Sequence, residues 1–159
     1  MSHSIRHWSA LPIAVLLFAC QAPVLNHDHA SLQQDSKDAR QLVSFPDEMR
    51  IHTLSNMRDH LQALQDIQGA LGREQYDRAS TIAEERLGLT SLKLHGAHDV
   101  AKFMPVAMQA IGSAMHRDAS RFAVAARDAG ATGDVKPALA ALSAVTAHCV
   151  ACHAGFRIQ

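Results

Sequence analysis

Apolar residues recur at spacings of three and four along most of the chain after residue 45, and this pattern limits the fold more than any other feature. The first such series is Leu54, Met57, Leu61, Leu64 and Ile67 or Gln68. This spacing places side chains on one face of an α-helix, whereas a half-buried strand alternates every two residues. The series predicts a first helix that begins at Pro46 and ends near the glycines at 69 and 72.

Three further segments show the same helical period, and no segment reads as a strand. We expect helices over residues 73–88, 105–130 and from about 134 to the C-terminus, with residues 89–104 as a loop containing a helical turn. The inward stripe of the third helix is Met108, Ile111, Met115, Ala119, Phe122, Ala126 and Ala129. That of the fourth is Leu139, Leu142, Val145 or Thr146, Cys149, Cys152 or His153, and Phe156. Alanine, a strong helix former, occurs 28 times, 17 of them after residue 100. Four amphipathic helices with short connections predict an all-α, antiparallel up-and-down four-helix bundle.

The first 20 residues have the pattern of an export signal. Arg6 precedes a short apolar stretch, residues 10–19, which is too short to span a bilayer as a helix. Cys20 directly follows it in "LFAC", which resembles the lipobox of bacterial lipoproteins, although Phe18 departs from the usual residue type. Cleavage near Ala22 is the alternative. Both readings predict a periplasmic protein, and the first adds a membrane anchor through lipidated Cys20.

Residues 21–45 are polar without a sustained apolar period, so we expect a flexible tether before a four-helix domain at 46–159. His27 and His29 in this segment are expected to be solvated. The chain carries 15 basic and 15 acidic residues without a basic stripe. Charge therefore offers no case for a nucleic-acid partner.

The segment "CVACHAGFR" (149–157) carries the chemistry. Its C-x-x-C-H spacing is that of c-type haem attachment. On a helix, Cys149 and Cys152 lie one turn apart and can form thioethers with the two vinyl groups of one porphyrin, while His153 can ligate the iron. A redox-active disulfide and a metal site completed by His95 and His98 are the alternatives.

This tail resembles the cytochrome c′ family of class II c-type cytochromes, which are exported four-helix bundles with haem bound near the C-terminus. Phe156 and Arg157 match the aromatic and basic residues that follow the histidine in that family. The first helix also resembles the family in "RIHTLSNM", where Arg50, Leu54 and Met57 have the expected offsets. The resemblance covers about residues 46–159 and implies one covalent haem c per chain.

The resemblance leaves the sixth iron ligand open. It implies that Leu54 covers the distal side, which would leave the iron accessible to small gases, whereas Met57 is the competing ligand. A methionine ligand raises the reduction potential and suits electron transfer. Arg50 would approach a haem propionate, and Arg157 would lie near the haem.

We therefore expect an exported c-type cytochrome that transfers electrons and is not an enzyme, with a redox partner protein. A binding module for nitric oxide or carbon monoxide is the first alternative, and a haem-free metal or thiol-redox protein the second. The resemblance also implies a homodimer. His60 and His116 are minor alternatives as axial ligands.

Overall fold

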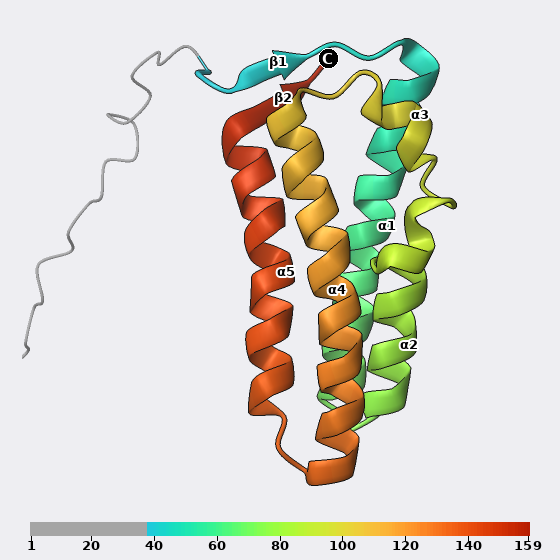
Figure 1. Cartoon of the computed structure of the whole chain (residues 1–159), viewed down its shortest axis with the longest axis vertical. Coiled ribbons are helices and arrows are strands. Elements are labelled where there is room, and N and C mark those ends of the chain that lie inside the picture. Colours follow the sequence, from blue (N-terminus) through green and yellow to red (C-terminus); the bar gives the residue numbers. More distant parts are fainter. Residues whose placement is uncertain (1–37) are drawn as a thin grey trace, which may run out of the picture. The chain divides into compact units, whose positions relative to one another are not determined.

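The computed structural model describes residues 38–159, which belong to one compact unit (Figure 1). In chain order its elements are β1 (Gln41–Val43), α1 (Asp47–Leu71), α2 (Tyr76–Arg86), the 3-10 turn η2 (Leu89–Leu92), α3 (Ala97–Ala101), α4 (Val106–Thr132), α5 (Lys136–Gly155) and β2 (Phe156–Ile158). The unit is mostly helical, which confirms the expectation of an all-α protein at that level. The expected export signal with Cys20, and residues 21–37, lie outside the described residues.

Local sequence signals explain where the long helices begin and end. Pro46 and Pro105 are the N-caps of α1 and α4, where a residue without a backbone N–H costs nothing. Helix α4 runs to Thr132, slightly beyond its predicted end. It stops at Gly133, whose φ of 76° belongs to the left-handed region that glycine adopts without a steric penalty.

The four longer helices lie side by side in Figure 1, but they do not share their contacts equally. Helix α5 packs along α4, α4 along α2, and α2 along α1, while no comparable packing joins α1 to α5 within the described unit. Helices α2 and α4 are therefore the inner pair, each with two packed helical neighbours. Phe122 of α4, together with Ile67 of α1 and Val145 of α5, is almost completely buried in the main hydrophobic core.

The predicted inward stripes are correct in most positions and wrong at two leucines. The stripe of α4 is buried except at Ile111, which is half-buried. Leu61 of α1 and Leu139 of α5 were expected to face inward, yet they are 70% and 50% exposed. Since α1 and α5 each have only one extensively packed helical neighbour, part of their apolar surface stays uncovered.

Two short strands correct the expectation that the chain contains none. Strand β1 pairs in parallel with β2, so that Gln41 lies opposite Phe156 and Val43 opposite Ile158. The fourth helix therefore ends at Gly155 rather than at the C-terminus. Three-residue strands are too short to show a period of two, and their partners lie more than a hundred residues apart.

The same pairing corrects the predicted tether of residues 21–45. Val43 and Phe45 are 3% and 7% exposed, and they belong to a small apolar cluster with Val100 and Met108. Residues 41–45 are thus part of the folded unit. Only two of their apolar side chains are buried, and one of these, Val43, lies opposite Ile158 of the C-terminal strand.

Helix α5 is the one described helix that is long and apolar enough to cross a membrane by length and composition. Its Ala138, Leu142 and Val145 are buried in the main core. Packing against α4 accounts for this face of the helix.

Candidate functional site

The two cysteines and the histidine of the motif lie in the last two turns of α5. Cys149 and Cys152 are half-buried free thiols, and His153 is exposed. Burial raises the pKa of the Cys149 thiol, and burial together with the charge of Cys149 raises the pKa of Cys152. Both thiols are therefore uncharged near neutral pH. A thiolate-dependent redox role would need the opposite, a lowered thiol pKa.

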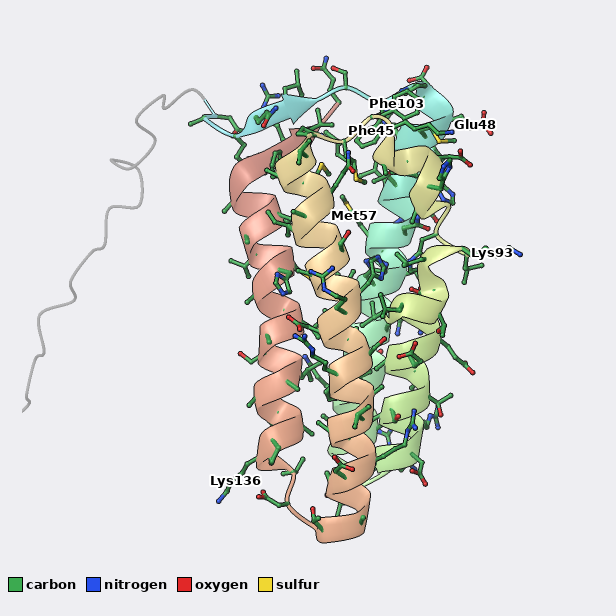
Figure 2. The ribbon with its side chains drawn as sticks, in the orientation of Figure 1. Phe45, Glu48, Met57, Lys93, Phe103 and Lys136 are labelled. Atoms are coloured by element: carbon green, nitrogen blue, oxygen red, sulfur yellow. The ribbon has the colours of Figure 1, made fainter. Side chains whose placement is uncertain are left out.

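A cavity of about 280 Å³ opens beside this motif. It is lined by Arg40, Met57, Met108, Cys152, His153, Phe156, Arg157 and Ile158. Met57 comes from α1, Met108 from α4 and the motif from α5, so three helices and β2 contribute walls. Figure 2 shows Met57 at the end of the helical unit that the two strands cross.

The inner walls of the cavity are apolar. Cys152, Phe156 and Ile158 pack against the small cluster that includes Met108. Phe45 of this cluster also contacts Phe103, with ring centroids 6.3 Å apart (Figure 2). Such walls suit a flat, largely apolar group.

The mouth of the cavity carries charge. Arg40 Nη1 donates a hydrogen bond to the backbone carbonyl of His153 at 3.4 Å, and its Nη2 contacts an Asp38 carboxylate oxygen at 2.6 Å. Arg157 approaches the same carboxylate at 3.7 Å. The hydrogen bonds from Arg40 lower the pKa of Asp38 to about 2, so the carboxylate is ionised over the physiological range.

The structure places the other sequence candidates unequally around the cavity. Met57 lines it, whereas Leu54 is half-buried on α1 and is not among the lining residues. Arg50 is not a lining residue either, and its guanidinium lies 3.6 Å from an Asp47 carboxylate oxygen. Arg40 could not be predicted as a site residue, because nothing in a polar segment signals that it will pair with the C-terminal strand.

Three histidines meet away from the cysteine motif, between α1, the connection from η2 to α3, and α4. The ring centroids of His60 and His95 are 4.6 Å apart, and His116 lies 5.6 Å from His95 and 5.9 Å from His60. His116 Nδ1 contacts the backbone carbonyl of Leu87 at 2.7 Å. In the described part of the chain, no three His, Cys, Asp or Glu side chains are arranged to hold a metal ion. The alternative metal site, with His95 and His98 beside the cysteines, thus has no structural support.

Glycine is required beside this cluster at position 96. Its φ is 59°, and an added Cβ atom would lie 3.1 Å from Nε2 of His52. The same Nε2 contacts the backbone carbonyl of His95 at 2.9 Å. A side chain at this position would strain the backbone and push against His52.

Acidification is expected to destabilise the protein through this histidine cluster. Burial, followed by the neighbouring histidines, lowers the pKa of His60 from 6.5 to about 4, and burial also lowers the pKa of His95 and His116. Below pH 6.5 these histidines are protonated in the unfolded chain but remain neutral in the folded protein. The free energy of unfolding therefore falls as the pH decreases toward 4. For His60 alone the loss is roughly 3 kcal/mol.

Urea unfolding at pH 7 and pH 4.5 would measure this loss, with His60→Gln as the informative variant. Because glutamine does not titrate, the variant should lose clearly less stability than the parent between these two pH values. His98→Gln is the matched control, since the His98 side chain is 88% exposed. Equal pH dependence in the parent and His60→Gln would contradict the prediction.

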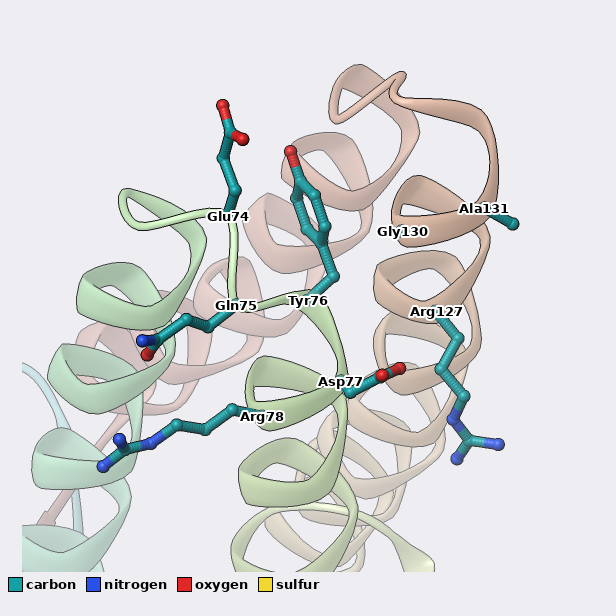
Figure 3. A pocket seen from close by; sticks show the side chains of 8 residues that line it. All are labelled: Glu74, Gln75, Tyr76, Asp77, Arg78, Arg127, Gly130 and Ala131. Atoms are coloured by element: carbon teal, nitrogen blue, oxygen red, sulfur yellow. The ribbon is translucent and has the colours of Figure 1, made fainter.

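A second, wider hollow of about 660 Å³ lies where the α1–α2 turn approaches α2 and α4 (Figure 3). It is lined by Glu74, Gln75, Tyr76, Asp77, Arg78, Arg127, Gly130 and Ala131. Arg127 also donates a hydrogen bond to Ser80 at 2.8 Å. The lining contains neither cysteine nor histidine, so we assign it no part in the chemistry of the motif.

No family model, no curated protein and no solved structure matches this chain. The lining of the cavity holds one uncharged thiol, that of Cys152, together with the exposed His153 and the methionines at 57 and 108. The second thiol, that of Cys149, lies one turn earlier on α5 and is not among the lining residues.

Proposed function

We propose that this chain is an exported c-type cytochrome, similar to cytochrome c′, that carries one covalent haem c and transfers electrons. The observation that supports this most directly is the cavity that Cys152 and His153 share with Met57. A C-x-x-C-H motif beside an apolar-walled space is what covalent haem attachment needs.

The residues around the cavity fit a covalently bound haem. Cys149 and Cys152 are unpaired thiols on successive turns and would hold the porphyrin through two thioethers, while His153 would supply the proximal imidazole. The phenyl, thioether and aliphatic side chains around the cavity would exclude water from the ring. When bound, haem supplies a one-electron Fe(II)/Fe(III) couple, whose potential the protein adjusts through ligation and burial.

The helix arrangement proposed with this function is an antiparallel up-and-down four-helix bundle with the haem-attachment helix last. The order in which the helices pack, α1 on α2, α2 on α4 and α4 on α5, supports this arrangement, because each long helix packs on the next one in the chain. Helices α1 and α5, whose contact would close the bundle, pack on each other less extensively than the sequential pairs do. Met57 of α1 and Cys152 of α5 nevertheless line the same cavity.

Electron transfer is favoured over gas binding by the placement of Met57. Its thioether is the sulfur of α1 that lines the cavity, while Leu54, the apolar cover implied by the resemblance, is not a lining residue. We therefore propose Met57 as the sixth ligand. A haem open to nitric oxide or carbon monoxide is the outcome expected if Met57 does not ligate.

The remaining expectations belong to the same proposal. Export to the periplasm, with or without a lipid anchor at Cys20, would place the chain where c-type haem is attached and where a redox partner protein could reach it. The thiol-redox form of the haem-free alternative is disfavoured by the raised pKa of both thiols. No enzymatic activity and no nucleic-acid partner is proposed, and a homodimer would follow from the resemblance.

The proposal predicts that the full chain, produced with haem-maturation machinery, contains a coloured group that survives denaturation and acid extraction. The protein mass should increase by one haem, and neither Cys149 nor Cys152 should react with a thiol reagent. The double variant Cys149→Ser/Cys152→Ser should retain no covalent colour after denaturation, because no thioether can form.

Cys20→Ser is the matched control, since this cysteine lies outside the motif. It should keep the covalent colour, whatever happens to its membrane attachment. A colourless matured parent with two free thiols in the motif would overturn the proposed function.

A further inference from the structure

The strand pairing carries an arginine from the N-terminal segment to the haem-attachment motif. Gln41 lies opposite Phe156 in the β1–β2 register, so Arg40, which precedes it, reaches the end of α5. There Arg40 donates to the carbonyl oxygen of His153 and lines the cavity. Arg157, in β2, lines the same cavity.

The two arginines share a single carboxylate. Asp38 accepts from Arg40 at 2.9 Å and 2.6 Å and lies 3.7 Å from Arg157. These side chains are about 40% exposed (42% for Arg40 and Asp38, 41% for Arg157), so they stand at the mouth rather than in the interior. Two guanidinium groups against one carboxylate leave one positive charge in excess at this mouth.

We propose that Arg40 and Arg157 form a carboxylate-binding wall that holds the acidic edge of the bound porphyrin. The inference rests on the proposed function, and it assigns a role to residues that the sequence left in a tether or placed only near the haem. The other walls are apolar, so a flat ring with carboxylate groups at one edge matches the cavity in both respects. Guanidinium groups bind carboxylates through paired, charge-assisted hydrogen bonds.

Arg50, the propionate partner implied by the family resemblance, is less suited to this role. Its side chain is not among the residues that line the cavity, whereas those of Arg40 and Arg157 are. Arg40, which precedes strand β1, would supply the positive charge in place of Arg50. The pairing of β1 with β2 would thereby contribute to the binding of the haem.

The reduction potential of the haem-loaded protein tests this wall, because it responds to charge near the iron. Arg40→Gln and Arg157→Gln each remove a positive charge that favours the reduced state. Each should lower the Fe(II)/Fe(III) ratio at a fixed external potential by roughly three- to tenfold, where tenfold corresponds to about 59 mV. Asp38→Asn removes a negative charge and should shift the ratio in the opposite direction.

Two control variants separate charge from folding. Arg40→Lys keeps the charge and should retain most of the parent potential, and Arg73→Gln removes an exposed arginine at the distant α1–α2 turn and should leave it unchanged. If the coloured parent, Arg40→Gln and Arg157→Gln all have the same reduction potential, the proposed carboxylate-binding role of the two arginines is wrong, even if the variants melt at lower temperature. A colourless matured parent would instead mean that the proposed function itself is wrong.

Discussion

Replacing Phe122 with alanine should lower the free energy of unfolding by about 3–5 kcal/mol. Phe122 is fully buried in the middle of α4, the helix that packs on both α2 and α5. The substitution removes the transfer free energy of a phenyl ring and leaves a cavity that three helices cannot close without moving. Since a domain of this size is stable by only about 5–15 kcal/mol, the variant should be close to unfolding.

Urea denaturation followed by circular dichroism would measure this effect. Val124→Ala is the matched control on the same helix, because Val124 is 55% exposed and its substitution should change stability by no more than about 0.5 kcal/mol. A loss below about 1 kcal/mol for Phe122→Ala would mean that α4 is not the centre of the core.

Met57→Ala should convert the matured protein from a low-spin to a high-spin spectrum and lower its reduction potential by about 100 mV or more. Axial ligand identity is the strongest influence that a protein has on haem potential, and a thioether stabilises the ferrous state. Met57 lines the cavity beside His153, and alanine at this position has no atom that can ligate. Visible spectra of the oxidised and reduced protein, together with a redox titration, would record both changes.

Leu54→Ala is the comparison that decides between the two residues of α1. If Met57 ligates, Leu54→Ala should keep the low-spin spectrum and a potential close to that of the parent. A parent that is already high-spin, an unchanged spectrum in Met57→Ala and faster carbon monoxide binding in Leu54→Ala would together contradict Met57 as ligand. The protein would then be the gas-binding module.

The helices were predictable because their signals are local. The period of α4, with Pro105 before it and Gly133 after it, depends on residues within a few turns of one another. Exposure was less predictable, as Leu61 and Leu139 show. Whether a residue on an apolar stripe is buried depends on which neighbouring helix covers it, and this is a property of the packed unit.

The candidate site divides in the same way. Cys149, Cys152 and His153 are adjacent on one helix, so the motif could be recognised without knowing the fold. The residues that surround the motif could not be recognised from the sequence. Arg40 reaches the motif from more than a hundred residues away, and Met57 and Leu54 occupy one helical face, so periodicity alone cannot say which of them lines a cavity.

By itself, therefore, the sequence determined the four long helices and the position of the C-x-x-C-H motif, because both follow from short-range spacing. Only the tertiary structure decided that β1 joins β2 and brings Arg40 beside Arg157. It also decided that Met57 of α1 lines the same cavity as Cys152 of α5. These features arise from contacts between segments distant in the chain, whose closeness is selected by the burial of apolar surface in the whole unit.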